Sequence, residues 1–470
     1  MKLNFIFFLL FPTIFLSIFE ENEVKGEEFI VFVHGLSGFG RDELLGLGYW
    51  GFPLITGNNF TDWMQKQTGL KTFEASVGPF SSNWDRACEL YAQILGRRTD
   101  FGRAHATAQS HKRMGRDFRK DPLSKKYNYY KQGGFFPNWN QNNKVHFIGH
   151  SMGGQTIRYL ERLLHRGDTA ETTLKNSGGY NNDVDGPMSD LFQTGVDRDW
   201  IASITTIATP HDGSTLHTKL DSTGAPITSF LKDILLLVGK STSGIAEGLY
   251  LYDFDLDHHS GFAKPPSANT FDGFKAWADQ IFSSSKWGSG YKDLADYHLS
   301  PQSMKEFNAA GPRVYPNTRY FAMQTYQTEV CAFNWNDQCS DIDISPLMVV
   351  TANLMGDLDP GFQKSTCDKW GNCFDNSWEP NDGAVPKRSS TGPTFGVPTT
   401  GSFSSGAPVL HPTNLLGSYK YSKTDLVKGK WYYRPIQRDH LQAIGLSAYW
   451  VPWFMYEHIR DTINAIKYSN

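Results

Sequence analysis

The sequence predicts an α/β fold in which helices cover both faces of a mostly parallel central sheet. The main indication is residues 144–160, where the apolar run Val145–Ile148 leads through a Gly-His-Ser-Met-Gly turn into a segment with apolar residues at helical spacing. Glu28–Gly40 is an apolar strand followed by a glycine-punctuated loop, and Ile201–Ser214 is a β-branched strand that leads into Thr-Pro-His. Continuous apolar runs of this length are typical of strands buried on both faces, as in parallel sheets.

Local patterns place the other elements around these three strands. We expect helices at 62–67, 84–95, 230–238 and 450–467, further strands at 71–77, 320–326 and 348–351, and loops at 117–143 and 389–414. No internal repeat is visible. We therefore expect residues 26–470 to form one α/β domain with long insertions.

Composition sets broad limits on the class of protein. The chain has 470 residues, of which 39% are hydrophobic and 20% charged, which is ordinary for a globular protein with a large core. The net charge of −3 provides no strong attraction to nucleic acid.

The N-terminus has the pattern of a secretory signal peptide. An early lysine precedes an apolar run from Phe5 to Phe19, which is shorter than the roughly twenty residues of a membrane span. Pro12 and the acidic residues from Glu20 onward also argue against a membrane anchor. We expect residues 1–25 to be removed on secretion, although no clean cleavage motif is present and an uncleaved anchor is the alternative.

Four of the five cysteines fall in two close pairs. In an oxidising compartment we expect the disulfides Cys331–Cys339 and Cys367–Cys373, while Cys88, in the helix predicted at 84–95, is expected to be a buried free thiol. A zinc site built from the four paired cysteines is the weaker interpretation, because no C-x-x-C spacing is present.

Gly149–Gly153 has the form G-x-S-x-G between a strand and a helix, which is the context of a nucleophile elbow in an α/β-hydrolase fold. The sharp turn would lift the Ser151 hydroxyl above the sheet. The backbone N–H groups of Met152 and of Leu36, which follows the His-Gly that ends the first strand, would then form an oxyanion hole. A tight turn without catalytic function is the alternative for each motif.

A nucleophilic serine needs a histidine to take its proton and a carboxylate to orient that histidine. In this fold the chain order is serine, acid, histidine, so both partners should follow Ser151. His440 is favoured because it lies just before the terminal helix, whereas His411 lies in a low-complexity loop and His458 within the helix. Asp382 is the preferred acid, and chain order alone leaves three rivals open: Asp357, Asp359 and Asp375.

Two further stretches are ambiguous from local sequence alone. His105 and His111 are six residues apart, a spacing that surface histidines share with metal ligands. The apolar segment 230–238 has small Gly, Ser and Thr residues on both sides. It is either a packed core helix or part of a mobile lid around 214–250 that covers an acyl pocket.

The chain resembles the zinc-containing lipases of staphylococci and of thermophilic Geobacillus and Bacillus. The resemblance runs in the family's order from about residue 28 to about residue 465. The blocks that carry it are 33–41, 48–51, 77–89, 100–115, 149–156, 205–213, 252–257, 381–383 and 439–441.

The resemblance implies an α/β-hydrolase fold with a Ser-Asp-His triad and an oxyanion hole. The implied residues are Ser151 as nucleophile, His440 as base, Asp382 as orienting acid, and the N–H groups of Leu36 and Met152 as oxyanion donors. It also implies a structural zinc site whose four positions are Asp85, His105, His111 and Asp257. Two imidazoles and two carboxylates would close a tetrahedral site and leave no position for a reactive water.

The sequence departs from the family at one metal site. The family commonly binds calcium through a Glu two residues after the catalytic histidine and an Asp seven residues after it, but here these positions are Gln442 and Ser447. Because calcium depends on carboxylate and carbonyl oxygens, we expect this calcium site to be absent.

These observations predict a secreted triacylglycerol lipase that acts on long-chain esters at a lipid–water interface through an acyl-enzyme intermediate. A phospholipase or a broad carboxylesterase with the same triad is the first alternative. A non-catalytic lipid-binding protein is the second, and it has no need of three triad residues. We expect no nucleic-acid partner and no obligate protein partner.

Overall fold

The computed structural model describes the greater part of the chain. The described residues are 26–41, 43, 48–51, 57, 59–119, 133–223, 254–262, 271–287, 291–332, 337–358, 366–394, 408–410, 427–446 and 452–467. The expected signal peptide, the apolar segment 230–238, most of the expected lid and Ser447 lie outside these residues.

A seven-stranded sheet forms the centre of the molecule, in the order β12-β13-β7-β6-β5-β1-β2. Every neighbouring pair in it is parallel. Its strands are β1 (Phe29–Val33), β2 (Lys71–Ala75), β5 (Val145–His150), β6 (Ile201–Ile207), β7 (Arg319–Tyr326), β12 (Val409–Leu410) and β13 (Trp431–Gln437). The sheet has the parallel strands and helical layers of an α/β-hydrolase, so the predicted fold class is confirmed.

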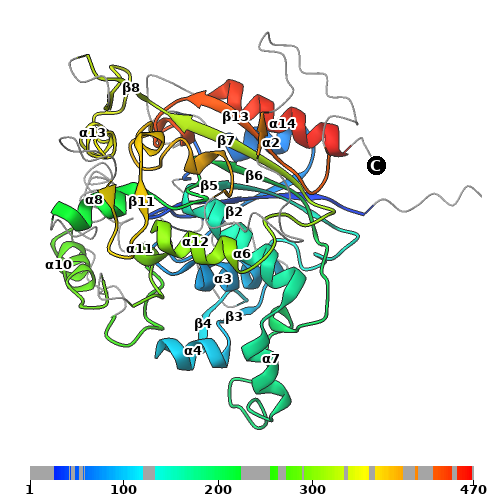
Figure 1. Cartoon of the computed structure of the whole chain (residues 1–470). Helices are drawn as coiled ribbons and strands as arrows, with labels where there is room; N and C mark the ends of the chain where they lie inside the picture. The colour runs from blue at the N-terminus through cyan, green and yellow to red at the C-terminus, as the bar shows by residue number, and fades with distance from the viewer. Residues whose placement is uncertain are drawn as a thin grey trace, which may run out of the picture.

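Helices cover both faces of this sheet, as Figure 1 shows. One face packs against α3 (Asn83–Leu95) and α6 (Met152–Arg166), and the other against α2 (Phe60–Thr68) and α14 (Trp453–Lys467). Phe29, Val31 and Val33 of β1 enter the first core, whereas Ile30 and Phe32 enter the second. This alternation explains why β1 is apolar at every position.

Smaller elements surround the sheet. Its helical insertions are α4 (Arg103–Gln109), α7 (Thr169–Asn176), α8 (Thr215–Thr223), α10 (Phe271–Phe282), α11 (Ala295–His298), α12 (Pro301–Ala309) and α13 (Val349–Met355). The described residues also form three antiparallel pairs: β3 (Arg98–Asp100) with β4 (Met114–Asp117), β8 (Thr328–Val330) with β9 (Gln338–Ser340), and β10 (Thr366–Cys367) with β11 (Cys373–Phe374). In Figure 1, α4, β3, β4 and α7 project together below the α3–α6 layer.

The prediction of a strand at 348–351 is wrong, because this segment begins helix α13. Its β-branched residues favour a strand locally. The buried residues Thr351, Ala352 and Met355 share one helical face, whereas Val350 is 74% exposed on another. Packing of this apolar face therefore outweighs the local preference.

The cysteines pair as the sequence predicts. Cys331 is bonded to Cys339 and Cys367 to Cys373, while Cys88 is a buried free thiol on α3. Within the described part of the chain, no helix has the length and apolar character needed to cross a membrane.

Candidate active site

Ser151 lies at the sharp turn between β5 and α6, with φ 54° and ψ −128°. This left-handed φ is strained for a residue with a side chain. The turn is possible because its glycines let backbones approach closely. A Cβ at Gly149 would lie 2.7 Å from the Gly154 nitrogen, and one at Gly153 would lie 2.1 Å from the Val33 carbonyl oxygen. The local sequence therefore requires glycine on both sides of the serine.

The structure brings the three residues of the predicted triad together from distant parts of the chain. His440 Nε2 lies 2.9 Å from Ser151 Oγ, and His440 Nδ1 lies 3.1 Å from Asp382 Oδ2. Ser151 and His440 are nearly buried, and Asp382 is fully buried. The backbone of His440 also donates to the Asp382 carbonyl at 2.9 Å, which anchors the two loops to each other.

Hydrogen bonds hold the Asp382 carboxylate in place. Its Oδ2 accepts a hydrogen bond from the Thr325 hydroxyl at 2.6 Å, while its Oδ1 accepts from the backbone N–H groups of Ala384 and Val385 at 3.0 and 2.8 Å. These three hydrogen bonds fix the orientation of the carboxylate. Asp382 is therefore suited to orienting the His440 imidazole and stabilising its charged form.

A second histidine, His150, packs against His440 with the ring centroids 4.6 Å apart. Burial lowers the pKa of His150 well below its ordinary value, and a positive charge on His440 would lower it further. Its ring nitrogens contact the His440 carbonyl at 3.1 Å and the Tyr49 hydroxyl at 2.7 Å. His150 is thus a neutral positioning group that puts no competing positive charge beside His440.

The end of β1 lies directly against the serine turn. A Cβ at Gly35 would come within 2.7 Å of Ser151 Cβ, and the Leu36 and Met152 side chains belong to one apolar cluster. Within the described residues, no acceptor is bonded to the backbone N–H of Leu36 or Met152. Two unpaired donors beside a nucleophile fit an oxyanion hole.

A cavity of about 110 Å³ opens over Ser151 and His440. The loops after β1, β5 and β6 contribute to it, as expected at the carboxyl ends of parallel strands. Most of its remaining wall is apolar and is formed by Leu216, Leu299, Met348, Val385, Leu441, Ile444 and Leu446. Such a wall is suited to holding a hydrocarbon chain next to the serine.

A cluster of possible metal ligands lies apart from this cavity. One ligand atom each from Asp85, His105, His111 and Asp293 falls within 4.8 Å of the others. Asp293 therefore takes the place expected for Asp257, and the prediction of Asp257 is corrected. The Asp257 carbonyl accepts a hydrogen bond from Lys112 Nζ at 3.0 Å, but its side chain is not part of the cluster. Asp293, just before α11, lies far along the chain without a spacing motif, so the sequence carried no local signal for it.

The chemistry of the cluster fits a cation. Buried atoms of all four residues lack hydrogen-bond partners among the described residues, namely Asp85 Oδ1, His105 Nε2, His111 Nε2 and Asp293 Oδ2. His105 Nε2 lies 3.3 Å from Asp293 Oδ1 and His111 Nε2 lies 3.0 Å from Asp293 Oδ2. Ligands of a tetrahedral zinc ion are about 3.3 Å apart, so the cluster can hold a metal ion.

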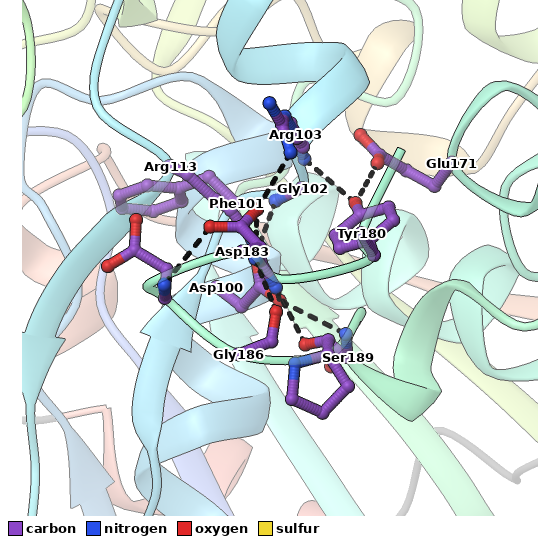
Figure 2. A network of polar contacts seen from close by, with 12 residues as sticks. Asp100, Phe101, Gly102, Arg103, Arg113, Glu171, Tyr180, Asp183, Gly186 and Ser189 are labelled. Carbon is purple, nitrogen blue, oxygen red and sulfur yellow. Dashed lines mark hydrogen bonds and ion pairs between the residues drawn. The ribbon is translucent and has the colours of Figure 1, made fainter. Parts of the chain in front are cut away.

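A charged network holds the segment that carries both cluster histidines, as Figure 2 shows. Arg113 binds both oxygens of Asp100, at 2.9 and 2.6 Å, and donates to Asp183 at 3.0 Å. Glu171 of α7 accepts from the backbone N–H of His105 at 2.8 Å and from that of the preceding residue at 3.1 Å. The α7 region thus fixes α4 at the cluster.

Known proteins resemble this chain over most of its described length. A family model described as "Lipase-like, C-terminal domain" matches residues 26–396. The lipase of Staphylococcus hyicus is 30% identical over 430 residues, which cover 90% of this chain and 54% of that protein. The chain thus spans about half the length of this full-length relative.

Three solved structures share the fold. EstA from Clostridium botulinum has a TM-score of 0.69 and 32% identity, covering 96% of this chain and 91% of its own. Lipase 1 from Pelosinus fermentans has a TM-score of 0.67 and 30% identity, covering 92% of this chain and 98% of its own. The Staphylococcus hyicus lipase structure has a TM-score of 0.66 and 28% identity, covering 96% of this chain and 98% of its own. With the matched family model, these likenesses show that the chain belongs to the lipase-like C-terminal domain family and is a relative of the staphylococcal lipases.

Proposed function

We propose that this protein is a secreted lipase that hydrolyses the carboxylic ester bonds of triacylglycerols. The observation that carries the proposal is the hydrogen-bonded series Ser151–His440–Asp382 at the base of an apolar cavity. The names of the relatives, two lipases among them, support a lipid substrate.

In this mechanism the Ser151 oxygen attacks the ester carbonyl while His440 Nε2 takes its proton. The N–H groups of Leu36 and Met152 donate to the oxyanion. His440 then gives the proton to the departing alcohol, and a water molecule, activated by the same histidine, releases the fatty acid from the acyl-enzyme. Asp382 holds the imidazole in the tautomer with Nδ1 protonated and stabilises its charged form.

The remaining parts of the chain have proposed roles that fit this activity. Residues 1–25 would direct secretion, residues 26–470 would form one hydrolase domain, and the region around 214–250 would act as the lid. Leu216, at the start of α8, lies on the cavity wall, so movement of this region would change access to Ser151.

We infer that the Asp85, His105, His111 and Asp293 cluster binds zinc. Its two imidazoles suit zinc better than magnesium or calcium, which prefer oxygen ligands. A site closed by four protein ligands would be structural and would tie α3, α4 and the segment before α11 together.

We infer that the calcium site near His440 is absent. Gln442 replaces a carboxylate, and its amide is already used: Oε1 accepts from the Asp439 N–H at 3.1 Å and Nε2 donates to the Asp343 carbonyl at 2.6 Å. These bonds hold the loop without a cation.

The proposed activity is tested by hydrolysis of emulsified long-chain triglyceride, with the wild type beside Ser151→Ala, and by labelling of both proteins with a serine-reactive phosphonate. We expect the wild type to release fatty acid and to be labelled, and the variant to do neither. Labelling together with activity on phospholipid or only on short soluble esters would replace the triglyceride assignment. A wild type that neither hydrolyses nor labels in detergent would favour the lipid-binding alternative.

Removing the proposed zinc is expected to destabilise the protein. A chelator abolishes a stabilisation of about 2.7 kcal/mol when the free metal had been at 100 times its dissociation constant. The melting temperature, measured by calorimetry, should fall after chelation and recover with Zn²⁺ but not with Mg²⁺. Before chelation, Asp293→Asn should already melt at a lower temperature than the wild type, and the chelator should lower its melting temperature by less than it lowers that of the wild type. An unchanged melting temperature in the chelated wild type would contradict the structural role.

A further inference from the structure

Asp85 also faces a second pair of histidines, through its other carboxylate oxygen. His258 and His259 lie within the short described segment 254–262, and both are buried. Their Nε2 atoms lie 3.2 and 3.6 Å from Asp85 Oδ2. One ligand atom from each of the three residues lies within 4.8 Å of the other two.

Hydrogen bonding to the described residues accounts for only one of the two ring nitrogens of His259. The Tyr291 hydroxyl donates to the Gln109 carbonyl at 2.9 Å, so it accepts from His259 Nδ1, which is also 2.9 Å away. The neutral ring then carries a lone pair on Nε2. Nε2 is buried and has no hydrogen-bond partner among the described residues.

This lone pair faces a carboxylate oxygen. At 3.6 Å the separation of His259 Nε2 and Asp85 Oδ2 is too long for a hydrogen bond. Two buried acceptors that face each other repel, and the arrangement is stable when a cation lies between them. The ligand atoms of one tetrahedral zinc ion are about 3.3 Å apart. This is close to the distances from Asp85 Oδ2 to His258 Nε2, 3.2 Å, and to His259 Nε2, 3.6 Å.

The two oxygens of Asp85 point to different histidines. Oδ1 lies 3.6 Å from His105 Nε2, in the first cluster, while Oδ2 faces His258 and His259. We propose that Asp85 bridges two divalent cations, and that Asp85, His258 and His259 form a second site for zinc or a similar borderline metal. Three protein ligands leave a fourth position for a solvent molecule.

The competing arrangement has one ion only. In it His258 Nε2–H donates to Asp85 Oδ2 at 3.2 Å and orients this carboxylate from outside the metal site. That arrangement leaves His259 Nε2 without any partner in the described part of the chain. The second site goes beyond the proposed ester hydrolysis and does not depend on it, because it concerns how the turn at 254–262 is joined to α3.

The number of ions per chain distinguishes the two arrangements. The protein is stripped of metal, loaded with excess Zn²⁺, freed of unbound zinc by gel filtration, and analysed by native mass spectrometry and elemental analysis. We expect two zinc ions in the wild type, one in His259→Ala and one in Asp293→Asn. We expect a marked loss of both in Asp85→Asn, because only this residue is shared. His165→Ala, which removes a histidine outside both clusters, should keep two.

A titration of the stripped wild type with Co²⁺ needs no variant and so does not depend on a variant's folding. Its visible absorption should rise until two equivalents have been added. One equivalent in the wild type, whether or not His259→Ala retains it, would overturn the second site. Two zinc ions that persist in His259→Ala would also overturn it, because the second ion would then lie elsewhere.

Discussion

His440→Ala is expected to lower the turnover number for ester hydrolysis by about 10⁵-fold, which corresponds to about 7 kcal/mol of transition-state stabilisation. The reason is that the Ser151 hydroxyl loses its proposed base 2.9 Å away, and the leaving alcohol loses its proposed acid. The Michaelis constant should change little, because the apolar cavity wall remains. Steady-state kinetics on a soluble ester measures both parameters.

Three further variants test whether the residues act as a unit. Ser151→Ala/His440→Ala should be no less active than Ser151→Ala alone, because the base has no function without its nucleophile. Asp382→Asn should lose about 10⁴-fold, because the imidazole then adopts the wrong tautomer. His165→Ala is the matched control and should retain activity. A loss below about tenfold in His440→Ala would assign the base to another residue.

Arg86→Met is expected to lower the free energy of unfolding by roughly 4 kcal/mol. Arg86 is a fully buried cation on α3 that donates to the His34 carbonyl at 2.6 Å, to the Gly78 carbonyl at 2.8 Å and to the Thr156 hydroxyl at 2.8 Å. Methionine fills similar space but leaves these buried acceptors without their donor. Urea unfolding, followed by tryptophan fluorescence, measures the change.

The same variant should also slow ester hydrolysis. The His34 carbonyl immediately precedes the Gly35–Leu36 peptide, so a loosened loop would misalign the proposed Leu36 oxyanion donor. Arg119→Met is the control, since Arg119 is 55% exposed and pairs with Asp117 at the surface. A surface pair of this kind contributes about 0–1 kcal/mol. Equal effects of the two substitutions would show that the Arg86 bonds contribute little.

Local sequence was sufficient for the elements whose pattern reflects burial. β1, β5 and β6 are apolar throughout because both of their faces are covered, and the serine turn needs glycines where its backbones meet. Helix α13 was mistaken for a strand because its few residues carry a β-branched preference. Only its packed face determines its helical form.

Chain order narrowed the acid of the triad to a few aspartates, and the folded chain separates them. Asp382 Oδ2 lies 3.1 Å from His440 Nδ1. Its rival Asp375 instead accepts from the backbone N–H of Ser377 at 3.0 Å and caps a short 3₁₀ turn. Both residues lie in irregular segments, so no periodicity could show which of them faces the histidine.

The sequence by itself determined the parallel α/β core, the serine turn, the chain order of the proposed triad and the two disulfides, because each depends on residues that are close along the chain or on a strict pattern of burial. Tertiary structure alone decided which carboxylates meet which histidines. Asp293 joins the cluster of possible metal ligands in place of Asp257, and Asp85 comes to face His258 and His259 as well as His105. Such contacts depend on where separate loops pack in space, and sequence separation does not encode that distance.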